Sequence, residues 1–265
     1  MASKKSKQPR ANSLAKLSLE ALSHTSLGVA SASAVAPLGQ GLYLIVNDDE
    51  GLFLAGGPKP VRLRDVEEHA ALGDLESVCV SEDGRHAYAV SEESGEVFRF
   101  EIRRASGSAE LLPGERLGVL ERPGDKKNKG WEGVAFLAAG FVEGWPSALV
   151  VAHEGKPMAL GFYALPDLGE LHLVDLDETL DGLLGDVADV AVCPRTRHLF
   201  LLSDESHRIV QARITPSEVT LLASFDLTLD DDEKPEGLAF ETDDVLVIVT
   251  DHSSQMLRFR LTPEC

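Results

Sequence analysis

The chain has 265 residues and a mass of 28.5 kDa, which suits one large domain with a buried core. It carries 25 basic and 44 acidic residues, a net charge of −19, and five of the basic residues precede the first acid, Glu20. The remaining 20 basic and 44 acidic residues have a net charge of −24. Such a body repels phosphate backbones, so nucleic acid is excluded as a main partner.

The sequence shows neither the pattern of a membrane helix nor that of a signal peptide. No apolar run reaches the roughly 18 residues that a membrane helix needs. The basic start leads into Ala11-Asn12-Ser13, where a signal peptide would have an apolar core. The three cysteines, Cys79, Cys193 and Cys265, are widely spaced and odd in number, which is typical of a reducing compartment. We therefore expect a cytoplasmic protein with no membrane partner.

A short phrase recurs five times along the chain: a polar residue, a small residue and then an alternating apolar strand. Its copies begin at Ser33, Glu76, Glu132, Asp189 and Glu236. A second apolar strand follows each copy and ends in a polar pair, with these strands expected at 42–46, 86–90, 148–152, 198–202 and 245–249. Third strands are expected at 96–102, 208–214 and 255–261. The period-2 alternation of Val, Leu and Phe predicts β-sheet throughout.

The spacing of the repeats predicts the architecture. The phrases begin 43, 56, 57 and 47 residues apart, close to the ~40–50 residues of a four-stranded propeller blade. We therefore predict an all-β, five-bladed β-propeller; a six-bladed ring is the alternative and needs a further repeat. The last repeat ends after three strands, so residues 16–22 are predicted to supply the outer strand and close the ring. Residues 1–14 are predicted to be a disordered basic tail before a single domain at 15–265.

The phrase starts also predict a site. The first strand of each blade lines the central channel of a propeller, so these five positions should meet at one mouth. Glu76, Glu132, Asp189 and Glu236 would converge there, with Ser33 in the fifth place. Either their pKa values rise or a cation neutralises them, and calcium suits a set of hard oxygen ligands. Two alternatives stay open: acids that bond to backbone amides of the neighbouring blade, and a catalytic carboxylate system without metal.

The polar pairs that close the second strands are expected at the opposite mouth or in its loops. Among them, His153 beside Glu154 offers a group that titrates near neutral pH, as a base or a ligand. Lys129 lies in the basic loop 124–130, just before Glu132, and suits an anionic ligand. His153, Glu154 and Lys129 are therefore the candidate catalytic residues. A capping role for the histidine and a solvated loop are the alternatives.

Several segments resemble the SdiA-regulated family of bacterial β-propellers, over roughly residues 70–261. The run Asn128-Lys129-Gly130-Trp131-Glu132-Gly133 looks like the family's Asn-Lys-Gly-aromatic-Glu-Gly signature. Residues 186–208 match its most recognisable block, and Lys234-Pro235-Glu236-Gly237 echoes its closing Glu-Gly pair. A looser likeness connects the chain with the esterase-like domain associated with phytases. The resemblance implies a propeller fold and a calcium ion in the channel.

Two classes of function follow from these features. The first is a calcium-binding module that holds a small anionic ligand or a protein partner at a channel mouth, as a monomer. The second is a calcium-dependent hydrolase of phosphoester, ester or lactone substrates, in which the ion polarises the substrate or activates water. A hydrolase needs a base beside the ion. The expected place of His153 at the other mouth favours the binding module.

Overall fold

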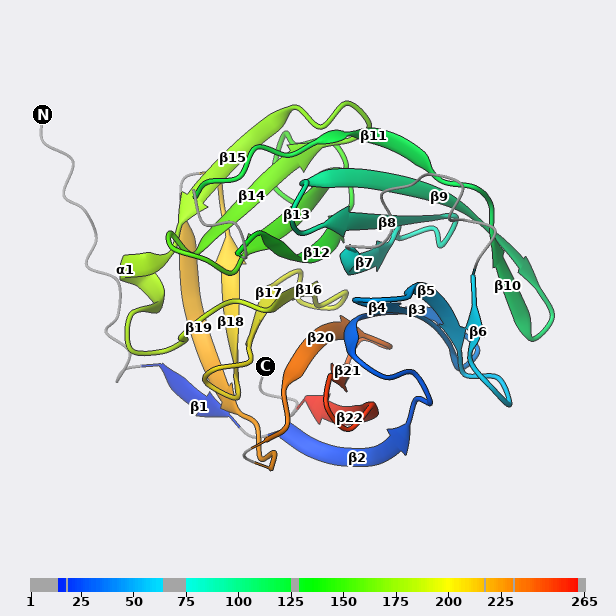
Figure 1. Ribbon diagram of the computed structural model, residues 1–265. Helices are drawn as coiled ribbons and strands as arrows, with labels where there is room; N and C mark the ends of the chain where they lie inside the picture. Colours follow the sequence, from blue (N-terminus) through cyan, green and yellow to red (C-terminus); the bar gives the residue numbers. More distant parts are fainter. Residues whose placement is uncertain are drawn as a thin grey trace, which may run out of the picture.

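The computed structural model describes residues 14–17, 19–63, 75–124, 129–216, 218–230 and 232–261. Five small sheets stand around a central axis and form a five-bladed β-propeller (Figure 1). The predicted all-β class and the count of five blades are therefore confirmed. All of the predicted basic tail except Leu14, and residues 125–128 of the basic loop, lie outside the described residues.

The blades follow the order of the chain, and the first strand of each blade is the innermost. Blade 1 consists of β3 (Ala32–Gly39), β4 (Leu42–Asn47), β5 (Gly51–Ala55) and β6 (Val61–Arg62). Blade 2 consists of β7 (Leu75–Val80), β8 (His86–Ser91) and β9 (Glu96–Ala105), with β10 (Ser108–Leu111) and β11 (Glu115–Val119) both paired to β9. Blade 3 consists of β12 (Trp131–Leu137), β13 (Ala148–His153), β14 (Ala159–Ala164) and β15 (Glu170–Asp175).

The last two blades also include strands from the start of the chain. Blade 4 consists of β16 (Asp189–Val192), β17 (Leu199–Ser203), β18 (Arg208–Ile214) and β19 (Val219–Asp226). Blade 5 contributes β20 (Pro235–Phe240), β21 (Val245–Thr250) and β22 (Gln255–Leu261). A single helical turn, α1 (Asp177–Leu180), connects blades 3 and 4. No helix in the described ranges is long and apolar enough to cross a membrane.

The N-terminal segment closes the ring. β2 (Leu19–Ser26) pairs antiparallel with β22, from Leu19 opposite Leu261 to Ser26 opposite Gln255, and becomes the fourth strand of blade 5. The predicted closing strand is confirmed, although it lies a few residues later in the chain than expected. The preceding β1 (Ala15–Leu17) pairs parallel with β19 and therefore extends blade 4. The start of the chain thus joins blades 4 and 5 at their outer edges (Figure 1).

The hydrophobic core is divided among the five interfaces between neighbouring blades, each with its own cluster of buried side chains. Successive residues of an inner strand point to opposite neighbours, as the period of a strand requires. Val78 packs between blades 1 and 2, whereas Cys79 packs between blades 2 and 3. Inner strands that are anchored on both sides in this way hold the walls of the channel in place.

Candidate functional site

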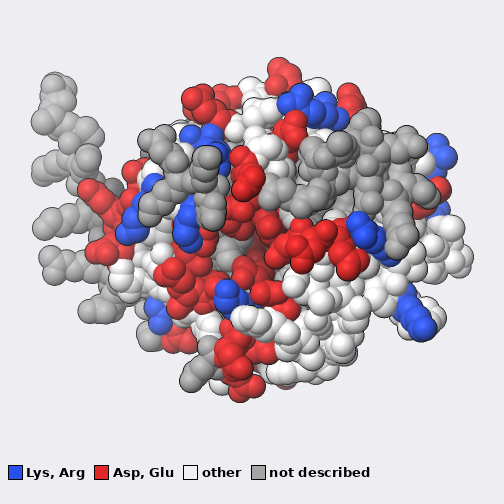
Figure 2. Space-filling view, viewed as in Figure 1, with Lys and Arg blue, Asp and Glu red and all other residues white. Residues whose placement is uncertain are grey.

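An acidic cavity of about 230 Å³ lies at the mouth of the channel where the inner strands begin. Nine carboxylates line it: Asp48, Glu76, Glu92, Glu132, Glu154, Asp186, Asp204, Glu236 and Asp251. Ser33, Ala188 and one cation, Lys234, complete the described lining. Figure 2 shows acidic side chains gathered around a hollow at the centre of this face.

The inner ring of this cavity is produced by β-bulges at the starts of the inner strands. In blades 1, 2, 3 and 5 the pairing with the second strand skips one residue, and the skipped residues are Ser33, Glu76, Glu132 and Glu236. A bulge redirects a side chain and is common beside functional sites. In blade 3 the small residue that follows allows a close approach between blades, because a Cβ on Gly133 would lie 2.6 Å from the Cα of Asp189. The phrase in the sequence is therefore the signature of this bulge.

Blade 4 departs from the predicted ring, because Ala188 and not Asp189 takes the fifth position. Ala188 lines the cavity, and its N–H donates to the carbonyl oxygen of Leu202 (2.9 Å). Asp189 is only 4% exposed; the N–H of Leu238 in blade 5 donates to its Oδ2 (2.6 Å) and the N–H of Val190 to its Oδ1 (2.7 Å). Asp189 thus stands where the other copies have a small residue. Its carboxylate bonds to backbone amides of its own blade and of the blades on either side.

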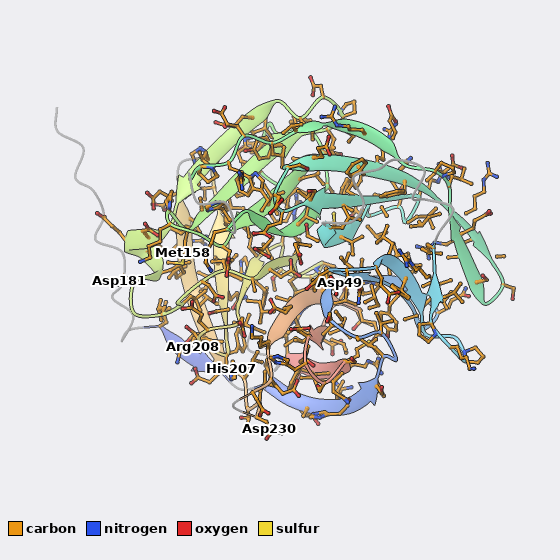
Figure 3. All side chains as sticks on the ribbon, in the orientation of Figure 1. Asp49, Met158, Asp181, His207, Arg208 and Asp230 are labelled. Atoms are coloured by element: carbon orange, nitrogen blue, oxygen red, sulfur yellow. The ribbon has the colours of Figure 1, made fainter. Side chains whose placement is uncertain are left out.

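The outer ring consists of the residues that directly follow the second strands: Asp48, Glu92, Glu154, Asp204 and Asp251. The expectation that these polar pairs lie at the opposite mouth is wrong. Each second strand runs antiparallel to the first, so it ends where the first begins, as His153 opposite Trp131 shows in blade 3. In Figure 3 the labelled Asp49, in the turn after β4, lies near the centre of the same face. Both rings therefore belong to one site.

The last residue of each second strand is a buried polar side chain: Asn47, Ser91, His153, Ser203 and Thr250. These side chains organise the turns that carry the outer ring; for example, the N–H of Ser206 donates to Ser203 Oγ (3.0 Å). In blade 3, His153 is 1% exposed, its Nδ1 lies 2.8 Å from the carbonyl oxygen of Pro157, and its ring meets Trp131 edge to face. The imidazole supports the turn and does not line the cavity.

The other two candidate catalytic residues form an ion pair. The Nζ of Lys129 lies 2.6 Å from Oε1 of Glu154, and of the two only Glu154 lines the cavity. Sequence reasoning missed Asp186 and Lys234 as lining residues. Asp186 precedes β16 and accepts hydrogen bonds from the hydroxyl of Ser203 and from the N–H of Glu205 (3.3 Å). Asp186 opens the block at 186–208 that resembles the family, and this position in the sequence could have identified it as a site residue.

Burial raises the pKa values of several carboxyl groups in this cavity. The pKa of Glu236 rises to about 8, and those of Asp48 and Asp186 rise to about 6, in each case mainly because burial disfavours the charged form. The pKa of Glu132 lies well above its ordinary value, first through burial and then through the charges of neighbouring carboxylates. Burial and the repulsion between these acids therefore favour proton uptake in the cavity near neutral pH.

The chemistry of the lining residues fits a hard cation. The potential ligands are oxygen atoms of carboxylates and a hydroxyl, which calcium prefers. The Oδ1 atom of Asp48 is buried and has no hydrogen-bond partner, so an acceptor is left for such an ion. Among the described His, Cys, Asp and Glu side chains, no three are grouped as a metal site requires. Water or ligand oxygens would have to complete the coordination.

Fold and site together define a class, a five-bladed β-propeller with an acidic cavity at one mouth of its channel. The model of the SdiA-regulated family matches residues 62–259, well over half of the chain, and the chain belongs to the SdiA-regulated family. The resemblance seen in the sequence is thereby confirmed. No curated protein matches the chain.

The similarity to solved structures supports the propeller fold and nothing beyond it. The crystal structure of glutaminyl cyclase from Myxococcus xanthus is similar with a TM-score of 0.60 and 12% identity, over 94% of this chain and 99% of that chain. The PQQ-bound aldose sugar dehydrogenase from Streptomyces coelicolor is similar with a TM-score of 0.53 and 12% identity, over 92% and 98%. At such identities a shared propeller carries no activity from one protein to another.

Proposed function

We propose that the acidic cavity binds calcium and that the protein is a ligand-binding module, with its ligand held at this mouth through the ion. One observation carries the proposal: nine carboxylates from all five blades line one cavity that has a single lysine among its described lining residues. Like charges at this density favour proton uptake or the binding of a cation. Calcium is the better fit because its coordination is flexible and its ligands are oxygen atoms.

The proposed ion would draw on both rings. Glu76, Glu132 and Glu236 would contribute from the inner ring, and the acids after the second strands from the outer ring. Bound calcium would supply a positive centre in a mouth that otherwise repels anions. A small anionic ligand, or a carboxylate on a protein partner, could then complete the coordination of the ion.

A hydrolase is less well supported. It needs a base that reaches the ligand beside the ion, and the described lining offers only carboxylates for this role, which the proposed ion would engage as ligands. His153 lies at the same mouth, but its side chain is buried and does not line the cavity, so its second nitrogen, Nε2, does not face a ligand there. The geometry therefore favours binding over hydrolysis.

Thermal unfolding of metal-stripped protein, with calcium, magnesium or EGTA added, tests the proposal. Calcium at about 100 times its Kd is expected to raise the Tm by roughly 5–10 °C, and magnesium by less. Glu132→Gln and Glu236→Gln should reduce this shift, whereas Glu110→Gln, at an exposed position of β10, should keep it. If no divalent ion moves the Tm of the stripped protein, the proposal fails.

A further inference from the structure

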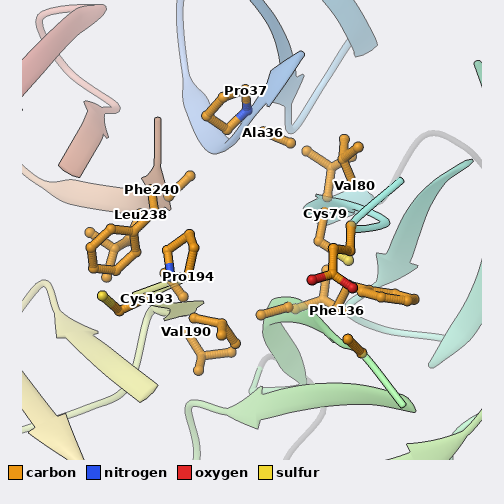
Figure 4. A pocket seen from close by; sticks show the side chains of 18 of the residues that line it. Ala36, Pro37, Cys79, Val80, Phe136, Val190, Cys193, Pro194, Leu238 and Phe240 are labelled. Carbon is orange, nitrogen blue, oxygen red and sulfur yellow. The ribbon is translucent and has the colours of Figure 1, made fainter. Parts of the chain in front are cut away.

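A second cavity, of about 380 Å³, lies at the other mouth of the channel, and most of the residues that line it are apolar. Its walls come from the later residues of all five inner strands and from the turns between β12 and β13 and between β16 and β17. Figure 4 shows Pro37, Val80, Phe136 and Phe240 around the opening. These four side chains come from four different blades and are only partly buried. Its volume lies within the range of small-molecule pockets, about 300–1,000 Å³.

This pocket is separate from the acidic cavity. The two cavities share no lining residue. Two positions beyond the inner ring, each strand contributes one aliphatic side chain that is at most 4% exposed: Val35, Val78, Val134, Val190 and Leu238. These five side chains also line the apolar pocket. A ligand in this pocket would therefore not contact an ion bound at the other mouth.

One cation is held in place at the apolar pocket. Arg197 lies in the turn after β16, where its φ is 57°. Its Nη2 donates to the carbonyl oxygen of Gly140 (2.6 Å), and its Cζ lies 5.1 Å from the centre of the Phe141 ring. Within the described ranges no carboxylate pairs with this guanidinium. A carbonyl and an aromatic ring thus fix its position and leave its charge without a carboxylate partner.

The remaining charged side chain at the pocket, Glu82, belongs to the turn after β7 in blade 2. Arg197 belongs to blade 4, which is not adjacent to blade 2 in the ring. An amphiphilic anion would therefore be attracted at one side of the pocket and repelled at another. This asymmetry selects one orientation of the ligand.

We propose that this pocket binds a compact apolar carboxylic acid. The hydrocarbon part would lie against the aliphatic and aromatic walls, and the carboxylate would meet the guanidinium of Arg197. Arginine suits this role because its planar donors match the two oxygens of a carboxylate. A guanidinium that is already held by Gly140 and Phe141 loses little freedom when the ligand binds.

A dye-displacement assay with the full chain tests the proposal. The reporter is 1-anilino-8-naphthalenesulfonate, which is itself apolar and anionic, and the competitors are octanoate, 1-octanol and octylamine. Octanoate is expected to displace the dye at roughly 10-fold lower concentration than the alcohol or the amine. Arg197→Gln should abolish this preference. Arg195→Gln is the matched control, because Arg195 is exposed in the same turn and does not line the pocket.

A second variant tests the location. Val80→Trp places a large ring in the mouth at a partly exposed position, and should abolish octanoate binding while the Tm stays within a few degrees. The proposal is overturned if octanol competes as well as octanoate, if Arg197→Gln keeps the preference, or if folded Val80→Trp binds octanoate normally. Glu132→Gln should leave octanoate binding unchanged, so that failure here is distinct from failure of the calcium site.

Discussion

Asp189 joins the inner strands of three neighbouring blades through one buried carboxylate. Burial raises its pKa well above the ordinary value, and the N–H donors of Leu238, Val190 and Val134 offset only part of that rise. In the sequence, Asp189 has the same spacing in the repeat as the ring acids. A polar residue before a run of small and apolar residues looks the same whether it lines the mouth or bonds to backbone amides between blades. The pairing with β17 shows that Asp189 stands one position later than those acids.

The first prediction concerns this bridge. Asp189→Ala leaves the buried N–H groups of Val190 and Leu238 without an acceptor, so the free energy of unfolding should fall by about 2–4 kcal/mol. Asp189→Asn keeps an acceptor oxygen and should cost less. Urea unfolding measures both, with Asp243→Ala at an exposed turn position as the control. A variant Asp189→Ala as stable as the parent would show that the bridge contributes nothing.

Ala188 marks the one place where the inner ring lacks a polar side chain. We expect Ala188→Glu to add a ring carboxylate and to raise calcium affinity roughly 3- to 10-fold. Ala188→Gln adds the same volume without the charge and should leave the affinity near that of the parent. Isothermal titration calorimetry decides the matter. Equal calcium affinity in the two variants would mean that position 188 does not face the proposed ion.

At the scale of elements, antiparallel pairing decides where the acids lie. The sequence singled out the polar pairs such as Ser91-Glu92, but a strand pattern does not state which mouth a strand end faces. The antiparallel hairpin decides the mouth, because the second strand runs back to the start of the first. The return of β8 therefore brings Glu92 to the mouth where Glu76 lies, and blade 3 adds Glu132 to the same cavity.

The N-terminal strands support a prediction of their own. Deleting residues 1–18 removes β1 but keeps β2, and is expected to lower the Tm by no more than about 3 °C. Deleting residues 1–26 also removes β2 and exposes the edge of β22, so the Tm should fall by more than about 10 °C and the protein should aggregate. Thermal scans and size-exclusion chromatography distinguish these outcomes. If both truncated proteins have a similar Tm and stay monomeric, β2 contributes little to the stability of the closed ring.

At the scale of the whole molecule, the acidic mouth governs the response to pH. The carboxyl groups of Asp48 and Asp186 have pKa values of about 6 and that of Glu236 about 8, above the values near 4 of an unfolded chain. The folded protein therefore binds these protons more tightly than the unfolded chain does. Raising the pH from 4 to 8 then lowers the stability that these groups confer.

We therefore expect the Tm of the metal-free protein to fall by several degrees between pH 5 and pH 8. The proposed calcium ion would favour the ionised carboxylates, so the stabilisation that it confers should increase over the same range. Differential scanning calorimetry at both pH values, with EGTA or with calcium, measures the two trends. A metal-free Tm that rises steadily over this range would contradict the raised pKa values.

The sequence by itself determined the all-β class, the five blades and the strand that closes the ring. Those features follow from a period of two and from a repeat, which are properties of the chain read in order. Only the tertiary structure decided that Ala188 replaces Asp189 in the ring, that the polar pairs join the acidic mouth, and that an apolar pocket with Arg197 lies at the other end. A bulge, a strand direction and a pocket each depend on which strands pair and in which register. Hydrogen bonds and packing between distant segments set that register, and no single segment of the chain records it.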